Sequence, residues 1–301
     1  MKRIFSVFLG WLLAFQASAS IYVLHDTEES SVRSLTFQLS KRLEISDSLI
    51  PIRPPHFLNN ISRMDDQDMV IAVGRDSFQQ ACLSMSRGAV FALFIGEEEY
   101  QAIRASCSVP TSGVFSGAPI EKRLALLKAI WLNPKPLAVL YSDAINLDQA
   151  SMVSTAAKFG FDFVFWQTPT DRISVLRSLT LLMDESDLIF SIVDSQLYQQ
   201  GNAQDMLKLL FHQQKVMVGS SFAFVRAGAL FAIHSDAKNK LALLSLMIQN
   251  WCTKGRMVEA AYPESLRVSF NPYLVKAHGI VLPSKLYLKD QFGLCSDSNC
   301  Q

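Results

Sequence analysis

The chain has 301 residues, of which 50% are hydrophobic and 18% are charged, a composition that suits a packed core and excludes intrinsic disorder. Its 28 basic and 27 acidic residues nearly cancel, so the overall charge offers no footprint for nucleic acid, and we expect none as a partner.

The N-terminus has the pattern of a secretory leader. Lys2 and Arg3 precede the apolar run 4–15, and the small residues Ala17-Ser18-Ala19 follow it. This run is too short to span a bilayer of about 30 Å, and a small-x-small sequence is typical of a cleavage site. We therefore expect residues 1–19 to be a signal peptide, and the remaining chain to be exported to the periplasm.

Strand and helix patterns alternate from residue 21 onward. The helical stretch 29–43 places Val32, Leu35 and Leu39 at spacings of three and four. Apolar runs predict strands before and after it, at 21–24, 68–74, 89–96 and 112–115. Strands that alternate with helices predict a parallel sheet covered on both faces.

The same alternation resumes in the second half. Helix 119–132 ends at Asn133-Pro134, because proline cannot continue a helix. Further apolar runs predict strands at 137–142, 161–166, 188–194 and 215–221. The sequence therefore predicts an α/β protein with two doubly wound parallel-sheet lobes in series.

Motifs for cofactors and catalysis do not occur. No GxGxxG, GxxxxGK[ST], GxSxG or CxxC is found, and the five histidines are scattered without an HxxxH pair. We therefore expect no cofactor, no metal and no enzymatic activity; a secreted hydrolase would lack a nucleophile and base.

The five cysteines leave one unpaired. Cys295 and Cys300 lie in the polar tail "CSDSNC", and an exported protein meets an oxidising compartment, so we expect a local disulfide between them. Whether Cys82 and Cys107 also pair is left open. Cys252 follows the apolar stretch "LALLSLMIQNW" and is expected to be a buried free thiol.

Several segments resemble one known family. They include "VDSQ" at 193–196, "KVMVGSSFAFVRAGALFAI" at 215–233 and "RVSFNPYLVKAHGIVLP" at 267–283, together with 112–142. The order of these motifs resembles the periplasmic substrate-binding proteins of ABC importers, in the family whose better-known members bind aromatic amino acids. The resemblance implies a type I periplasmic binding protein fold, with two lobes joined by a three-stranded hinge.

The resemblance also implies where the chain passes between lobes. Crossings are expected near Ser116-Gly117, at His234-Ser235 and between Pro263 and Leu266. The first lobe would then comprise 20–116 plus 236–264, and the second lobe 117–235 plus 265–301.

Asp194 ends the apolar stretch "LIFSIVDS". Groups just past the carboxyl ends of parallel strands line the crevice where ligands bind. The resemblance implies that Asp194 accepts a hydrogen bond or ion pair from a ligand amino or hydroxyl group. Alternatively, Asp194 only caps the helix that follows.

Other candidate ligand-binding residues lie at predicted strand ends and crossings. The guanidinium of Arg75 can bind a ligand carboxylate, or it can be a solvated surface group. The ring of Phe222 can stack on a ligand, or it can belong to the core. The candidates are His25, Arg75, Ser116, Tyr141, Ser142, Ser195, Ser220, Ser221, Phe222 and His234.

The chain also departs from the family pattern. After "LAVLY" it has "SDAINLDQ" instead of a Pro, Glu, Asn and Ser cluster, and Gly117 stands where an Asp is common. An aromatic amino acid therefore does not follow as the ligand. We expect a monomer that binds an amino acid or similar small polar solute for an inner-membrane permease. The alternative is a receptor that presents its ligand to a membrane sensor kinase or cyclase.

Overall fold

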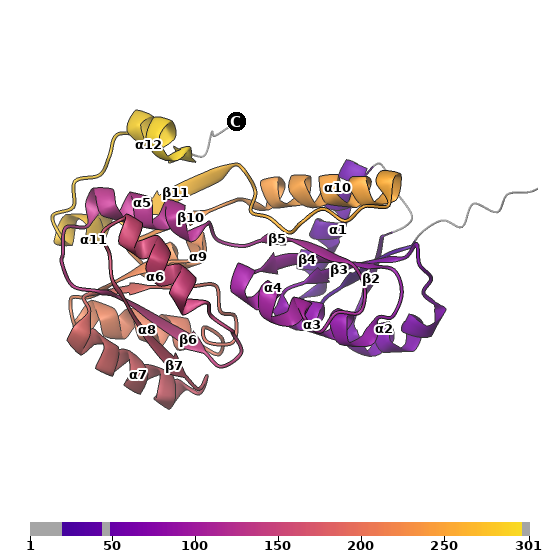
Figure 1. The fold of residues 1–301 in the computed structure, drawn as a ribbon, viewed down its shortest axis with the longest axis horizontal. Helices are drawn as coiled ribbons and strands as arrows, with labels where there is room; N and C mark the ends of the chain where they lie inside the picture. The colour runs from indigo at the N-terminus through magenta and orange to yellow at the C-terminus, as the bar shows by residue number, and fades with distance from the viewer. Residues whose placement is uncertain (1–19, 44–48, 297–301) are drawn as a thin grey trace, which may run out of the picture.

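The computed structural model describes residues 20–43 and 49–296, which form two α/β bodies lying side by side (Figure 1). We call the body built on the five-stranded sheet the first lobe, and the body built on the seven-stranded sheet the second lobe. The predicted leader, 1–19, lies outside the described residues and stays a prediction. Among the helices that are described, none is long and apolar enough to cross a membrane.

The first lobe contains a fully parallel sheet of order β2-β1-β3-β4-β5. Its central strands are apolar runs buried on both faces, as parallel sheets require. The strands are β1 (Ile21–Leu24), β2 (Leu49–Ile52), β3 (Met69–Val73), β4 (Ala89–Ile95) and β5 (Thr111–Phe115). The helices are α1 (Glu29–Leu43), α2 (Pro54–Asn60), the short 3-10 helix η1 (Ile61–Arg63), α3 (Arg75–Ser84) and α4 (Glu97–Arg104).

Helix α10 (Ala237–Lys254) returns to the first lobe from the second. The Asp236 side chain caps it by accepting a hydrogen bond from Asn239 N at 2.8 Å. Its apolar stripe, including Leu244 and Ile248, packs with α1 and the strands in one buried cluster.

The second lobe contains a sheet of order β12-β11-β10-β9-β8-β6-β7, in which only the β10–β11 pair is antiparallel. Its strands are β6 (Leu137–Ser142), β7 (Phe163–Thr168), β8 (Leu188–Phe190), β9 (Val216–Gly219), β10 (Phe231–His234), β11 (Leu266–Phe270) and β12 (Leu294–Cys295). Its helices are α5 (Ile120–Ile130), α6 (Gln149–Lys158), α7 (Arg172–Glu185), α8 (Asn202–His212), α9 (Phe222–Ala227), α11 (Pro272–Ala277) and α12 (Lys285–Phe292). The predicted fold class is confirmed.

Three short segments connect elements of the two sheets. They are residues 116–119 after β5, residues 235–236 before α10, and residues 262–265 after the bridge between Ala261 and Val114. The lobe boundaries predicted at 116/117, 235/236 and 264/265 stay predictions. Gly117 has φ of 81°, a left-handed conformation that favours glycine, which gives a backbone reason for glycine at this position.

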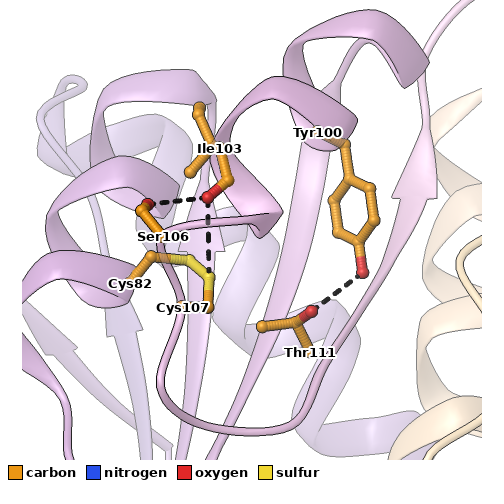
Figure 2. Close-up of a disulfide and its surroundings, with 6 residues drawn as sticks. All are labelled: Cys82, Tyr100, Ile103, Ser106, Cys107 and Thr111. Carbon is orange, nitrogen blue, oxygen red and sulfur yellow. Dashed lines mark hydrogen bonds between the residues drawn. A yellow bond between two sulfur atoms is a disulfide. The ribbon is translucent and has the colours of Figure 1, made fainter.

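The cysteines are arranged partly as expected. Cys82, at the end of α3, forms a disulfide with Cys107, just after α4 (Figure 2). Cys252 is free, but the expectation that it is buried is wrong. It lies in the last turn of α10, and its Sγ lies 4.0 Å from Met69 Sδ. Cys300 lies outside the described residues, so the Cys295–Cys300 pairing stays a prediction.

Candidate functional site

A cleft of about 480 Å³ lies between the two lobes. This volume falls within the range of small-molecule sites. The first lobe contributes the start of α4, and the second lobe contributes the starts of α5 and α6 and the end of β8. The connecting segments 116–119 and 262–265 contribute Ser116 and Tyr262. The lining residues that carry its chemistry are Glu97, Glu98, Ser116, Glu121, Arg123, Asn146, Asp148, Ser151, Thr155 and Tyr262.

Arg123 supplies a buried positive charge to the cleft. Its guanidinium lies over the ring of Phe190 at 4.0 Å, and Nη2 donates a hydrogen bond to Ser191 O at 2.5 Å. Its Nε, although buried, has no hydrogen-bond partner among the described residues. Burial lowers the pKa of Arg123 to about 10, so the group stays charged at neutral pH. Arg123 therefore keeps one donor available at the wall of the cleft.

Glu98 faces the same cleft from the first turn of α4. Burial raises the pKa of its carboxyl group to about 7; the charges of Glu97 and Glu99 raise it further, and Arg123 lowers it. The carboxyl group of Glu98 is therefore divided between its protonated and ionised forms near neutral pH. A ligand that donates a hydrogen bond or carries a positive charge would favour the ionised form.

Tyr262 closes the cleft from the third crossing segment. Burial raises the pKa of its hydroxyl, and the charges of Glu98 and Glu97 raise it further, so the hydroxyl stays neutral. Its ring packs edge-on against Phe115 at 5.1 Å, and Phe115 packs in the same way against Tyr100. This row of aromatic rings anchors the cleft wall to the core of the first lobe.

The two lobes also touch directly beside the cleft. The buried carboxylate of Glu99, in α4, accepts hydrogen bonds from Ser195 N at 2.7 Å, from Ser195 Oγ, and from Gly96 N at 3.1 Å. Burial raises the pKa of Glu99, while the Ser195 hydrogen bonds lower it. A Cβ at Gly96 would lie 2.7 Å from Val193 Cβ, so the close approach of the lobes requires glycine there.

Asp194 lies behind this contact and does not line the cleft. It is 1% exposed, and its carboxylate accepts hydrogen bonds from Ser142 N at 2.7 Å, Ser142 Oγ at 3.0 Å and Leu197 N at 3.0 Å. These bonds join the ends of β6 and β8 and agree with the capping alternative. Contact between Asp194 and a ligand stays a prediction.

Four of the other predicted residues lie in different parts of the structure. Ser116 lines the cleft, and Ser195 forms the contact between the lobes. Arg75, at the start of α3, donates from Nη1 to Asp76 Oδ1 at 3.0 Å and to Gln79 Oε1 at 3.1 Å. His25 is buried beside a separate hollow on the first lobe, with Nδ1 3.2 Å from Thr27 O. Among these four, only Ser116 is brought to the cleft.

The predicted residues of the second lobe are mostly engaged with protein atoms. Tyr141 Oη accepts a hydrogen bond from Gln149 Nε2 at 2.8 Å, and His234 Nε2 lies 3.0 Å from Ser269 Oγ. Burial lowers the pKa of His234. The half-exposed ring of Phe222 lies 5.5 Å from that of His234. None of these three residues lines the cleft, and neither do the remaining three, Ser142, Ser220 and Ser221.

Sequence reasoning missed Arg123, Glu98 and Tyr262. Glu98 lies in the first turn of a helix, where acidic residues are common, and Arg123 lies inside the predicted helix 119–132, so neither position stands out in the sequence. One signal was present, since Arg123 lies directly beside Leu124, a buried residue of the same helix.

The cleft offers hydrogen-bond donors and acceptors for binding. Arg123 and Tyr262 can donate, while Glu97, Glu98 and Asp148 can accept. Within the described ranges no group of three or more His, Cys, Asp or Glu residues is placed to hold a metal ion.

The state of Glu98 predicts a pH-dependent stability. Because its folded-state pKa of about 7 exceeds the ordinary 4.5, its ionisation opposes folding, and stability falls as pH rises from below 4.5 to above 7. Between pH 5 and 8, the free energy of unfolding should fall by about 2 kcal/mol more in the wild type than in Glu98→Gln. This figure is reduced to allow for the partial contact of Glu98 with solvent, and urea denaturation measures it. The exposed control Glu185→Gln should show the same dependence of stability on pH as the wild type. The same dependence in Glu98→Gln would contradict the raised pKa of Glu98.

Comparison with known proteins places this geometry in a structural class. No protein-family model matches the sequence, and no curated protein does so. Solved structures do match across most of the chain.

Three of them illustrate the likeness. An ABC domain from Streptococcus pneumoniae in complex with L-Trp has a TM-score of 0.69 at 16% identity, covering 89% of this chain and 97% of that one. A conserved domain protein from Vibrio cholerae has a TM-score of 0.66 at 14% identity, covering 88% and 96%. The ligand-free, open structure of a substrate-binding protein with adhesive properties from Clostridium difficile has a TM-score of 0.62 at 16% identity, covering 89% and 97%. The chain thus has the type I periplasmic binding protein fold, as predicted.

Proposed function

We propose that the chain is a periplasmic solute-binding protein, which takes a small polar molecule into the cleft between its lobes and presents it to the permease of an ABC importer. The observation that carries this proposal is the cleft of about 480 Å³, lined from both lobes and containing the buried Arg123 with its unpartnered Nε. The shared fold supports a role in binding without chemical conversion, and the protein would act as a monomer.

The charges of the cleft narrow the class of ligand. Four carboxylate side chains line it, against one guanidinium: Glu97, Glu98, Glu121, Asp148 and Arg123. Like charges repel strongly in a partly dry cleft, so a ligand with a net negative charge is disfavoured. A neutral or zwitterionic solute, with an acceptor for Arg123 and a donor for Glu98, fits this pattern. The L-Trp held by the Streptococcus pneumoniae structure supports a solute of the amino-acid class.

A thermal-shift screen tests the proposal. A ligand present at about 100 times its Kd stabilises the folded state by about 2.7 kcal/mol, which should raise the Tm by roughly 5 to 10 °C. The screen should include amino acids, amines, nucleosides, sugars and small carboxylates, with the carboxylates as the class expected to fail.

A matched pair of variants locates the site. Ser151 and Ser154 are both exposed on α6, but only Ser151 lines the cleft. Ser151→Trp should abolish the ligand-induced shift by filling the cleft, while Ser154→Trp should retain it. The proposal fails if no compound class raises the Tm, or if Ser151→Trp responds to the ligand as the wild type does.

A further inference from the structure

Large apolar side chains are unusually exposed at the outer end of the second lobe. Leu132, just after α5, is 94% exposed, Tyr273 in α11 is 84% exposed, and Val281 is 85% exposed. Leu286 and Tyr287 of α12 are 68% and 49% exposed. In Figure 1, α5, α11 and α12 lie in the upper left part of the second lobe, with α11 at the left and α12 above α5. We call the exposed side chains of residues 128–132 and 272–289 the tail face.

The two segments of the tail face meet around one hollow. Its walls are formed by residues 129–133 and 278–281, with a volume of about 390 Å³. The rings of Trp131 and His278 lie 6.0 Å apart across it. Leu132 and Val281 therefore belong to one continuous surface, which is separate from the cleft between the lobes.

The tail face is also positively charged. Residues 271–289 contain Lys276, Lys285 and Lys289 but no Asp or Glu, and Lys128 at the end of α5 is exposed as well. The nearest carboxylate in sequence is Asp290, directly after Lys289. In the whole chain, by contrast, 28 basic residues balance 27 acidic ones. The positive charge is therefore local and coincides with the exposed apolar side chains.

This combination matches the chemistry of an anionic membrane surface. Aliphatic side chains enter the boundary between headgroups and acyl chains, Trp and Tyr rings lie at headgroup level, and lysine ammonium groups reach lipid phosphates along their apolar stems. Lysines near such a surface contribute about 1 kcal/mol each, or roughly fivefold in affinity. A protein partner would satisfy the apolar side chains equally well but gives no reason for the exposed lysines Lys128, Lys276 and Lys289 on the same face.

We propose that the tail face binds peripherally to a membrane that carries anionic headgroups, with Leu132 and Val281 inserted at the interface and the lysines against the phosphates. The proposal does not require that the cleft bind a solute. It places the second lobe nearest the membrane and leaves the cleft walls clear of it.

Vesicle co-sedimentation tests this proposal. The chain from Ser20 onward is used, because the apolar run 4–15 would itself bind vesicles. We expect binding to vesicles of mixed phosphatidylcholine and phosphatidylglycerol, weak binding to phosphatidylcholine alone, and loss of binding at high salt. The double variant Leu132→Ser/Val281→Ser should weaken binding by about tenfold or more, and Lys276→Glu/Lys289→Glu by a similar factor.

Matched controls separate the tail face from exposure in general. Ile173 of α7 is 80% exposed, and Lys238 of α10 is exposed, but both lie outside the tail face. Ile173→Ser and Lys238→Glu should bind vesicles as the wild type does. The proposal is overturned if the protein does not bind anionic vesicles, or if the tail-face variants bind them with the affinity of the wild type. Sedimentation equilibrium showing a dimer that Leu132→Ser/Val281→Ser dissociates, without vesicle binding, overturns it in favour of a second copy.

Discussion

Replacing both Cys82 and Cys107 with alanine is expected to lower the free energy of unfolding by about 3 kcal/mol. The disulfide closes a loop with a sequence separation of 25 residues, and it ties the end of α3 to the segment that leads from α4 into β5. Without the bond, the unfolded chain gains the freedom of that loop. Cys82 is also 1% exposed within the first-lobe core, so its replacement removes packed sulfur as well.

Urea denaturation under non-reducing conditions measures this loss. Reduction of the wild type should reproduce it, and a reductant should leave the double alanine variant unchanged. The control Cys252→Ala, at an exposed position, should lie within about 0.5 kcal/mol of the wild type. A double variant as stable as the wild type would show that the disulfide does not constrain the first lobe.

Replacing Asp194 with asparagine is expected to cost a similar amount, about 3 kcal/mol. Oδ2 accepts from Ser142 N, while Oδ1 accepts from Leu197 N and Ser142 Oγ. An asparagine has one amide oxygen, so in either orientation its NH2 group faces a backbone N–H that is then left without an acceptor. Because the site is buried, water does not replace the lost bond.

A second aspartate provides the control. Asp148 accepts a hydrogen bond from Ser151 N at 2.9 Å, the same N-cap arrangement that Asp194 has with Leu197 N, but Asp148 is exposed and has no bond corresponding to Ser142. Asp148→Asn should cost less than about 0.5 kcal/mol, since Asn and Asp cap comparably. Equal losses for the two variants in urea denaturation would mean that the bonds to Ser142 contribute nothing to stability.

Much of the fold follows from short-range patterns in the sequence. Strands β1 and β6 coincide with the predicted ranges 21–24 and 137–142, because buried parallel strands are continuous apolar runs. Strand β2 was missed because its sequence, LIPI, contains a proline and half of its residues are exposed, so it has the pattern of an edge strand that only tertiary pairing with β1 stabilises. Strand β8 ends at Phe190 instead of 194, because Val193 leaves the sheet to pack against Gly96 of the other lobe.

The site is harder to predict because two lobes build it together. Strand-end residues such as Ser142 and Asp194 do lie at the expected edge of the sheet. Their polar groups are hydrogen-bonded to each other, however, and so are not available to a ligand. Arg123 and Glu98 come from the first turns of two helices in different lobes. Their meeting depends on how the lobes are oriented, which no local periodicity encodes.

The way the chain threads through the two lobes also determines when each can fold. One buried cluster of the first lobe combines Ile21 and Val32 with Leu244 and Ile248, and the main cluster of the second lobe extends from Ala118 to Leu294. A ribosome that has made the first two hundred residues has therefore completed neither of these two clusters, although another cluster of the first lobe takes all its buried residues from between Leu24 and Phe115. The two divided clusters need the last quarter of the chain, and such long-range contacts form slowly. The first lobe can therefore begin to pack early in synthesis, but it completes its core only after most of the second lobe has been made.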